Sequence, residues 1–531
     1  QYPEVFLIWN ILGVASIGLG KLEHALEAFK KVTRLNPNYP DGYNNLGTIL
    51  RNLGNLDEAL ASFNKALSLK PNYFEAYYNV AHTLKDQGKL QEAIDNFKKT
   101  ILLKPDYVDA YISIGVALKD QGKMDEAITA YNKAISLKPN YAKAYCNMGV
   151  ALRDQGKLDE AIIAYNKAIS LKSDYAEAYN NMGFALKDQG KMDEAITAYN
   201  MALSIKPDYA EAHLNLSFIL LYNSRLKEGL DKYEWRWKTK KSLSQKRHFL
   251  QPLWDGKISL SGKRILFWSE QGIGDTINRS SFIPIISSQA EYCILECQKK
   301  LVPLLKRTFP HIDVKTENRS LDSQRNDFDF HLPLGSLYKH LIKDISKIKK
   351  PRAFLVPDPV RVKFWKERLK SLGNGPFIGI SWKSSDMSPH RLQHFPPISD
   401  WCSVLKIPNV IFINMQYCNF KNDLEKIHKD FGVTVHNFND LNHYDDIDEV
   451  AALSAALDIV VCTKTTVRTI SAGVGTTTKI ANWRQSSFNT ILNTPVTSSF
   501  DVFDRDSSEP WNNVFSLIAE DITKSHKNYS S

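Results

Sequence analysis

The sequence predicts an α-solenoid of paired helices followed by an α/β domain of two halves, and three observations predict this fold class. A pattern of small residues recurs every 34 residues up to about residue 243. Beyond that point the 34-residue repeat is absent, and short runs rich in β-branched and aromatic residues alternate with helical stretches. The composition, with 43% hydrophobic and 24% charged residues, is that of a chain that can fold throughout.

Small residues mark the repeat. The three series are Gly13, Gly47, Gly115, Gly149 and Gly183; Gly20, Gly54, Gly88, Gly122, Gly156 and Gly190; and Ala25, Ala59, Ala93, Ala127, Ala161 and Ala195. Two apolar helical stripes flank a glycine in each unit, so a helix hairpin is predicted, with Gly190 in a turn at φ > 0. Pro207 cannot extend a helix and is expected to end the second one. Because one hairpin cannot bury its apolar face alone, neighbouring hairpins are expected to stack into one core.

This pattern resembles the tetratricopeptide-repeat family, whose units are helix hairpins. The predicted units are 6–39, 40–73, 74–107, 108–141, 142–175 and 176–209. A degenerate seventh unit, 210–243, has Ser224 in place of the turn glycine and Gly229 in place of the small alanine, as expected of a capping unit. Because the chain starts near a repeat boundary without an initiating Met, we expect a fragment with further repeats upstream.

An asparagine recurs at one position of the repeat, interrupted by Ser113. These residues are Asn45, Asn79, Asn147, Asn181 and Asn215. By resemblance to the family, this position faces the inner surface of the superhelix. An Asn side chain offers a donor and an acceptor, so it can pair with a peptide backbone of any sequence. Two interpretations stay open: a ladder that binds an extended peptide, and hydrogen bonding between repeats.

The second part of the chain predicts parallel sheets. Its candidate strands are Arg264–Ser269, Tyr292–Glu296, Phe328–Leu332, Phe377–Trp382, Asn409–Met415, Asp458–Cys462 and Lys479–Asn482. Helical patterns lie between them, as in α/β domains. We therefore predict the repeats over 1–243, a linker over 244–262, one Rossmann-like half over 263–358 and a second over 359–531.

Three strand ends carry residues suited to chemistry. A glycine turn after the first strand places Asp275 at the carboxyl edge of a sheet, where ligands bind, and it suits either a general base or a helix N-cap. Lys383 follows another strand and suits either a diphosphate or a solvated surface. The segment that opens with Lys464, Thr465 and Thr466 predicts a helix N-terminus suited to phosphate, although helix capping explains the threonines equally well.

Several functional classes are excluded or disfavoured. The sequence has no P-loop, no nucleophile elbow and no metal-ligand spacing, and we interpret the acidic stretch 445–449 as a helix start. No apolar run approaches the ~20 residues of a membrane span, and the first residues do not lead us to expect a signal peptide. Six scattered cysteines predict reduced thiols in a cytoplasmic protein. The net charge is +10, but the basic clusters are not interleaved with the aromatic residues of a nucleic-acid-binding module. The positive charge therefore fits a solvated surface or a phosphate-bearing ligand.

The segment Pro252–Ile277 resembles the junction in bacterial tetratricopeptide-repeat proteins that have a C-terminal glycosyltransferase-like domain. That domain is similar to the ADP-heptose:lipopolysaccharide heptosyltransferase group, whose GT-B fold has two Rossmann-like halves. The resemblance implies an inverting, metal-independent sugar transfer that uses a nucleotide-sugar as substrate and no cofactor. The architecture is also similar to that of the O-linked N-acetylglucosamine transferases, in which an Asn ladder holds the protein acceptor.

The resemblance implies roles for particular residues. Asp275 matches the catalytic aspartate of the heptosyltransferase group. The residues implied at the nucleotide-sugar are Trp382, Lys383, Gln416, Lys464, Thr465 and Thr466. This sequence departs from the group at the third site, because Lys464 stands where an acidic residue is usual and Thr469 stands near the usual histidine. Lys464 would instead add a positive charge beside the diphosphate, or activity has been lost.

The leading functional interpretation is an inverting glycosyltransferase that moves a sugar to a protein or peptide held by the repeats. The alternative is a non-catalytic protein-interaction scaffold with a degenerate glycosyltransferase-like domain. A third interpretation keeps the enzyme but makes the acceptor a surface glycan, with the repeats binding partner proteins.

Overall fold

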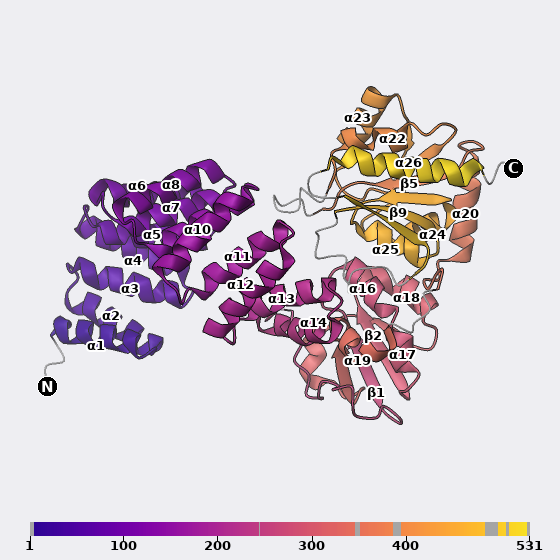
Figure 1. Ribbon diagram of the computed structural model, residues 1–531. Coiled ribbons are helices and arrows are strands. Elements are labelled where there is room, and N and C mark those ends of the chain that lie inside the picture. The colour runs from indigo at the N-terminus through magenta and orange to yellow at the C-terminus, as the bar shows by residue number, and fades with distance from the viewer. Residues whose placement is uncertain are drawn as a thin grey trace. The chain divides into compact units, whose positions relative to one another are not determined.

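The computed structural model describes residues 5–243, 245–345, 351–385, 395–483, 497–505 and 509–527. The chain divides into two compact units, Gln1–Pro207 and Asp208–Ser531 (Figure 1). The first unit is a solenoid of helix pairs. Its helices are α1 (Phe6–Gly18), α2 (Leu22–Leu35), α3 (Pro40–Asn52), α4 (Leu56–Leu69), α5 (Phe74–Asp86), α6 (Leu90–Leu103), α7 (Val108–Asp120), α8 (Met124–Leu137), α9 (Ala142–Asp154), α10 (Leu158–Leu171), α11 (Ala176–Asp188) and α12 (Met192–Ile205). Each pair falls within one predicted unit, which confirms the register of the repeat.

Glycine has two separate uses in each hairpin. Gly190, in the turn between α11 and α12, has φ = 81°, a backbone conformation that residues with a Cβ rarely adopt. The helix glycines allow close packing instead. A Cβ at Gly115 would lie 2.4 Å from the ring of Tyr131, and one at Gly183 would lie 2.9 Å from that of Tyr199. The predicted turn glycine is therefore confirmed, and the helix glycines are explained by the aromatic rings that pack against them.

The seventh hairpin belongs to the second unit. It consists of α13 (Ala210–Tyr222), α14 (Leu226–Tyr233), η1 (Glu234–Lys238) and α15 (Lys240–Leu243). Ser224 adopts φ = 59° at the turn, because this position needs a positive φ and has no glycine in this hairpin. Leu221, Leu230 and Tyr233 are buried in the same hydrophobic core as the first β-sheet. The contacts therefore group this hairpin with the α/β region, whereas the sequence suggested the end of the superhelix.

The first sheet of the second unit is parallel and, in the described residues, four-stranded. Its strands are β1 (Arg264–Trp268), β2 (Tyr292–Cys297), β3 (Asp313–Thr316) and β4 (Phe330–Pro333), in the order β3-β2-β1-β4. Its helices are α16 (Ile273–Ser280), α17 (Ile283–Ser287), α18 (Val302–Thr308) and α19 (Leu337–Ile345), with short 3₁₀ turns η2 (Lys299–Leu301), η3 (Arg319–Gln324) and η4 (Leu334–Ser336).

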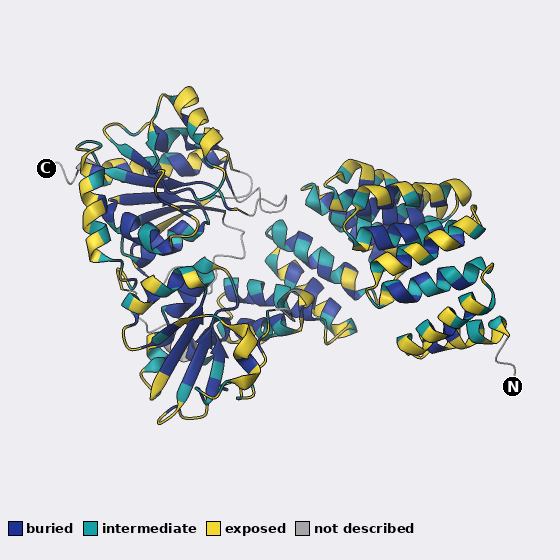
Figure 2. Cartoon of the chain, turned by 180° about the vertical axis from the view of Figure 1, so that it is seen from behind, coloured by how far each residue is buried: buried dark blue, intermediate teal, exposed yellow. Residues whose placement is uncertain are grey.

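The second sheet is also parallel and has six strands among the described residues. They are β5 (Phe377–Ser381), β6 (Ile411–Asn414), β7 (Val435–His436), β8 (Ile459–Cys462), β9 (Thr477–Trp483) and β10 (Phe500–Arg505), in the order β10-β9-β8-β5-β6-β7. Its helices include α20 (Pro359–Lys370), α22 (Cys402–Leu405), α23 (Lys421–Phe431), α24 (Ile447–Ala456), α25 (Thr466–Gly473) and α26 (Trp511–Lys527), with η5 (Ile398–Trp401) before α22. The predicted alternation of strands and helices in an α/β region is confirmed, and the central strands are buried on both faces (Figure 2).

Both sheets reverse their strand order at one point. In the first sheet, the chain runs from β1 to β2 on one side, and β4 pairs with β1 on the other side. In the second sheet, the chain runs from β5 to β6 on one side, and β8 pairs with β5 on the other side. Ligands of open parallel sheets bind in the crevice that such a reversal leaves at the carboxyl ends of the strands. A ligand is therefore expected in the crevice between β5 and β8.

The two sheets share one hydrophobic core. Ile447, Val450 and Ala451 of α24 are buried in the same cluster as Leu301 and Leu304, which lie at η2 and α18. A side-chain ion pair between α18 and α24 joins Arg307 to Asp448 beside this cluster.

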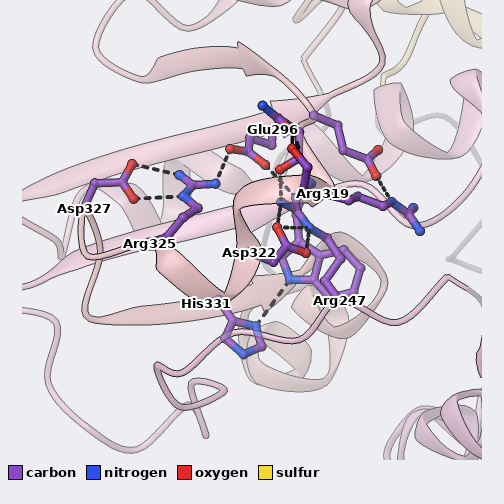
Figure 3. A network of polar contacts seen from close by, with 11 residues as sticks. Arg247, Glu296, Arg319, Asp322, Arg325, Asp327 and His331 are labelled. Atoms are coloured by element: carbon purple, nitrogen blue, oxygen red, sulfur yellow. Dashed lines mark hydrogen bonds and ion pairs between the residues drawn. The ribbon is translucent and has the colours of Figure 1, made fainter.

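A buried ion network fastens residues 247–254 to the first sheet (Figure 3). The Arg247 side chain is fully buried, donating from Nη1 to Glu296 Oε2 (2.6 Å) and from Nε to Asp322 Oδ2 (2.9 Å). The backbone N–H of Trp254 donates to the carbonyl of His331 on β4 (3.0 Å). These contacts pack the predicted linker against the sheet.

Candidate functional site

A pocket of about 160 Å³ opens at the carboxyl ends of strands from both sheets. The loop after β1 and helix α16 supply one side, and the segment after β8 and helix α25 supply the other. The lining residues are Gly272, Ile273, Gly274, Asp275, Asn278, Ser384, Phe395, Tyr417, Lys464, Thr465, Thr466, Arg468 and Thr469. The pocket thus lies at the order reversal of the second sheet, and it brings Asp275 together with Lys464, Thr465 and Thr466.

Helix α16 presents two polar side chains to this pocket. Gly272 occupies the N-cap, and Asp275 lies in the first turn rather than at the cap itself. Asn278 follows three residues later and therefore shares a helical face with Asp275. It is only 1% exposed, and its Oδ1 has no hydrogen-bond partner among the described residues. An unsatisfied buried amide at a pocket wall favours a polar ligand, because leaving such a group unpaired costs about 1–3 kcal/mol.

The first turn of helix α25 and the two residues before it present cations and hydroxyls to the same pocket. Thr465 is its N-cap residue, and its Oγ1 accepts a hydrogen bond from Ser381 Oγ (3.2 Å) at the end of β5. The Lys464 ammonium nitrogen and Arg468 Nε are both buried. Burial lowers the pKa of Arg468, and this effect is partly opposed by the Cys462 thiol and the Asp275 carboxylate. The pocket therefore pairs two cations and a helix N-terminus with one carboxylate.

The predicted residues Trp382, Lys383 and Gln416 are not among those that line the pocket. Lys383 Nζ donates to Asp423 Oδ2 (2.5 Å), and the Trp382 indole N–H donates to the same oxygen (2.8 Å). Gln416 is fully buried, and its Oε1 accepts from the backbone N–H groups of Trp382 (3.0 Å) and Lys383 (3.1 Å). Through these contacts, Gln416 joins the loop after β6 to the loop after β5. A role for Trp382, Lys383 and Gln416 in binding a nucleotide stays a prediction.

The lining residues that the sequence reasoning missed include Asn278 and Arg468. Asn278 lies three residues after Asp275 on α16, so helical spacing places it on the face of a residue already singled out. Arg468 lies in the first turn of α25, directly after the singled-out segment 464–466. The periodicity of the helix was the signal that would have found Asn278.

The asparagine positions of the repeats are half-buried and bond between neighbouring repeats. Asn45 Nδ2 donates to Asn10 Oδ1 (3.2 Å), and Asn79 Nδ2 donates to Asn44 Oδ1 (2.9 Å). Asn181 Nδ2 contacts Sγ of the cysteine at position 146 (3.7 Å). Hydrogen bonding between repeats is thus confirmed at these positions, and the binding of a peptide stays a prediction for the whole ladder.

The acidic stretch 445–449 starts a helix, as predicted. Asp446 is the N-cap of α24 and accepts from the backbone N–H of Glu449 (3.2 Å). Glu449 in turn accepts from the indole N–H of Trp365 (2.7 Å). Within the described ranges, no group of His, Cys, Asp and Glu side chains has the arrangement of a metal site. Among the helices in those ranges, none combines the length and apolar character needed to cross a bilayer.

Sequence models of known families match the first unit. Models described as "TPR repeat" match residues 17–54, 81–122, 115–152 and 149–190. Models described as "Tetratricopeptide repeat" match residues 40–73 and 176–209, and residues 62–95.

The chain is also similar to named proteins. It is 32% identical over 238 residues to Protein FlbA of Caulobacter vibrioides, and it spans only 40% of the length of that curated relative, while the match covers 42% of this chain. The structure of a thermophilic TPR protein in Thermus thermophilus is 27% identical and covers 34% of this chain and 100% of that one, with a TM-score of 0.31. That of YrrB, a TPR protein with an unusual peptide-binding site, is 26% identical and covers 35% and 97%, with a TM-score of 0.29. The family models and the helix pairs show that residues 17–209 carry tetratricopeptide repeats, which form a protein-interaction scaffold.

Proposed function

We propose that the second unit is an inverting, metal-independent glycosyltransferase of the GT-B type, with a nucleotide-sugar as donor. One observation carries the proposal: a carboxylate from the first sheet and two cations from the second, Asp275 with Lys464 and Arg468, line one pocket. A transferase of this type needs a base for the acceptor and positive charge for the departing diphosphate. The pocket is lined by residues that follow parallel strands of both sheets, which supports the same interpretation.

In the proposed step, the acceptor oxygen attacks the anomeric carbon of the donor sugar, and the bond from that carbon to the diphosphate oxygen breaks. The acceptor proton moves to the Asp275 carboxylate, and the bonding electron pair leaves with the diphosphate. Lys464 and Arg468 stabilise the charge that develops there, together with the first-turn N–H groups of α25. Lys464 stands where the heptosyltransferase group usually has an acidic residue, and in the proposed step it adds a positive charge beside the diphosphate instead.

The proposed acceptor is a protein or peptide that lies along the repeats. Asn45, Asn79 and Asn181 each use an amide N–H in bonding the preceding repeat. An Asn side chain has two N–H donors and one acceptor oxygen, so one inter-repeat bond does not exhaust it. The same bond holds the amide in a fixed orientation, which favours a regular spacing of contacts along an extended chain.

The test is turnover of a panel of nucleotide-sugars by the wild-type chain, Asp275→Asn and a matched control. The control is Asp430→Asn, an exposed carboxylate on α23. We expect Asp275→Asn to lower kcat at least 100-fold, because general-base catalysis contributes about 10²–10⁴-fold. The control should match the wild type. Equal rates for Asp275→Asn and wild type would remove Asp275 from the mechanism.

A second candidate function is a scaffold whose α/β region binds a nucleotide without turning it over. The departures at Lys464 and Thr469 favour this alternative, because both replace groups that the heptosyltransferase group usually has. Calorimetry with nucleoside diphosphates separates the two functions when it is combined with the turnover assay. Binding without turnover of any donor in the panel supports the scaffold, and turnover excludes it.

A further inference from the structure

The seventh hairpin contacts the segment that carries Asp275 through one phenol oxygen. Tyr233, the last residue of α14, is only 3% exposed. Its Oη accepts hydrogen bonds from Gln271 Nε2 (2.8 Å) and from Arg279 Nη2 (3.0 Å). Gln271 and Arg279 also bond each other, Nη2 to Oε1, at 2.9 Å. The two residues bracket Asp275 in the chain, so a single side chain of the hairpin holds both ends of this segment.

A second contact of the hairpin fixes the start of the same segment. Arg236 on η1 is 3% exposed, and its Nε donates to Oε1 of the buried Glu270 (3.1 Å). Its Nη2 donates to Ser336 Oγ on η4 (2.8 Å). The backbone N–H of Gly335 donates to the other oxygen of Glu270 (3.3 Å), and a Cβ at that glycine would lie 2.1 Å from Glu270 Oε1. The loop that follows β1 is therefore held from the hairpin and from the first sheet at once.

The charges of this network are balanced inside the core. Burial disfavours the charged form of Arg279, but Tyr233, Asp275 and Glu270 outweigh it and raise the pKa of the guanidinium. Arg279 therefore stays a cation, and its N–H groups need hydrogen-bond acceptors. Tyr233 Oη of the hairpin and Gln271 Oε1 of the loop supply them. Without the phenol oxygen of Tyr233, one N–H of a buried cation and one N–H of Gln271 would lose their partner, at a cost of about 1–3 kcal/mol.

We propose that Tyr233 is a positioning residue of the candidate site, which sets the place of the Asp275 carboxylate by holding Gln271 and Arg279. The consequence for turnover rests on the proposed function, whereas the consequence for the local structure does not. The seventh hairpin then acts as a structural part of the α/β unit and not only as a cap on the repeats.

The test compares Tyr233→Phe with Tyr338→Phe in the full chain. Tyr338 is a matched control, because it is fully buried in the same core, and its hydroxyl has no partner among the described residues. Hydrogen exchange is measured at the amides of 270–280 and at those of β1 and β2. We expect Tyr233→Phe to speed exchange of 270–280 about five- to tenfold more than that of the strands. Tyr338→Phe should leave the ratio unchanged.

Three results would overturn the proposal: unchanged exchange at 270–280, equal acceleration throughout the first sheet, and the same effect from Tyr338→Phe. A second variant, Gln271→Met, removes a donor to the phenol without touching the hairpin. Its effect on exchange should be less than additive with that of Tyr233→Phe, because both break one network. Full additivity would also count against the proposal.

Kinetics add a readout that a purely structural role would not give. Tyr233→Phe should lower kcat while KM for the donor changes less than about twofold, because the carboxylate and not the diphosphate site is displaced. A chain that turns over no donor would reject the proposed function and leave the exchange result standing. A rise in KM with kcat unchanged would contradict positioning of Asp275.

Discussion

At the scale of single residues, the candidate site depends on partners that are far apart in the chain. Asp275 and Arg468 line one pocket, and the carboxylate opposes the loss of charge on the guanidinium. Lys383 has the chemical type that a diphosphate site needs, yet its ammonium group pairs with Asp423. Helix periodicity extends a site along one face, as Asn278 shows, but it does not reveal which distant carboxylate neutralises a lysine.

Arg468 offers a prediction at this scale. Arg468→Gln removes a buried cation from the pocket, and we expect the Kd for a nucleoside diphosphate to rise about tenfold or more, since a hydrogen bond to a charged group is worth about 1.5–3 kcal/mol. Titration calorimetry on the full chain measures this. The control is Arg368→Gln, because Arg368 on α20 pairs with Asp440, does not line the pocket, and should leave Kd unchanged when replaced. The same Kd for both variants would place the anion elsewhere.

At the scale of elements, the repeats were predictable and the edges of the sheets were not. Each helix pair of the first unit follows from apolar stripes and a turn glycine, and all but one also from a closing proline, which Ser173 replaces in the unit 142–175; all of these are local signals. The strands β3, β7 and β10 were missed. Strand β7 has two residues, and half of the residues in β3 and in β10 are exposed, so no continuous apolar run marks these strands. The central strands, which carry the pocket, are buried and were found.

Close packing in the repeats gives a prediction about stability. Gly115→Ala adds a Cβ 2.4 Å from the Tyr131 ring, and we expect the hairpin of α7 and α8 to lose about 1–3 kcal/mol. Hydrogen exchange of these two helices in the full chain measures the loss. Gly18→Ala is the control, because its Cβ would meet nothing within 4 Å, and it should be neutral or slightly stabilising. Equal exchange for the two variants would mean that helix packing tolerates the methyl group.

The core of the first sheet gives a prediction about pH. Burial and the positive charge of Arg247 lower the pKa of His331 to about 4. An unfolded histidine has a pKa of about 6.5, so only the unfolded state takes up the proton as pH falls between these values. His331 therefore contributes stability that is complete above about pH 6.5 and is lost toward about pH 4. In His331→Gln, the new side chain can still accept a hydrogen bond from the Trp268 indole N–H. We expect the melting temperature of this variant to fall less than that of the wild type between about pH 7 and about pH 5. A curve parallel to that of the wild type would contradict this contribution.

At the scale of the whole molecule, the chain joins a protein-interaction scaffold to an α/β unit with its own pocket. The sequence places the change of architecture near residue 243, where the repeat stops. The contacts divide the chain after Pro207, because the apolar side of the last hairpin packs with the first sheet. Such a division depends on which core a helix face joins, and a periodic pattern does not contain that information. A core that spans both sheets holds the two walls of the pocket in one unit.

The most direct measurement is a crystal structure of the full chain with a nucleotide-sugar bound. We predict a diphosphate against the first turn of α25, within hydrogen-bond distance of Lys464 and Arg468, and a sugar that faces Asp275. A nucleotide bound away from this pocket, or one whose sugar lies out of reach of the Asp275 carboxylate, would contradict the proposed transferase site.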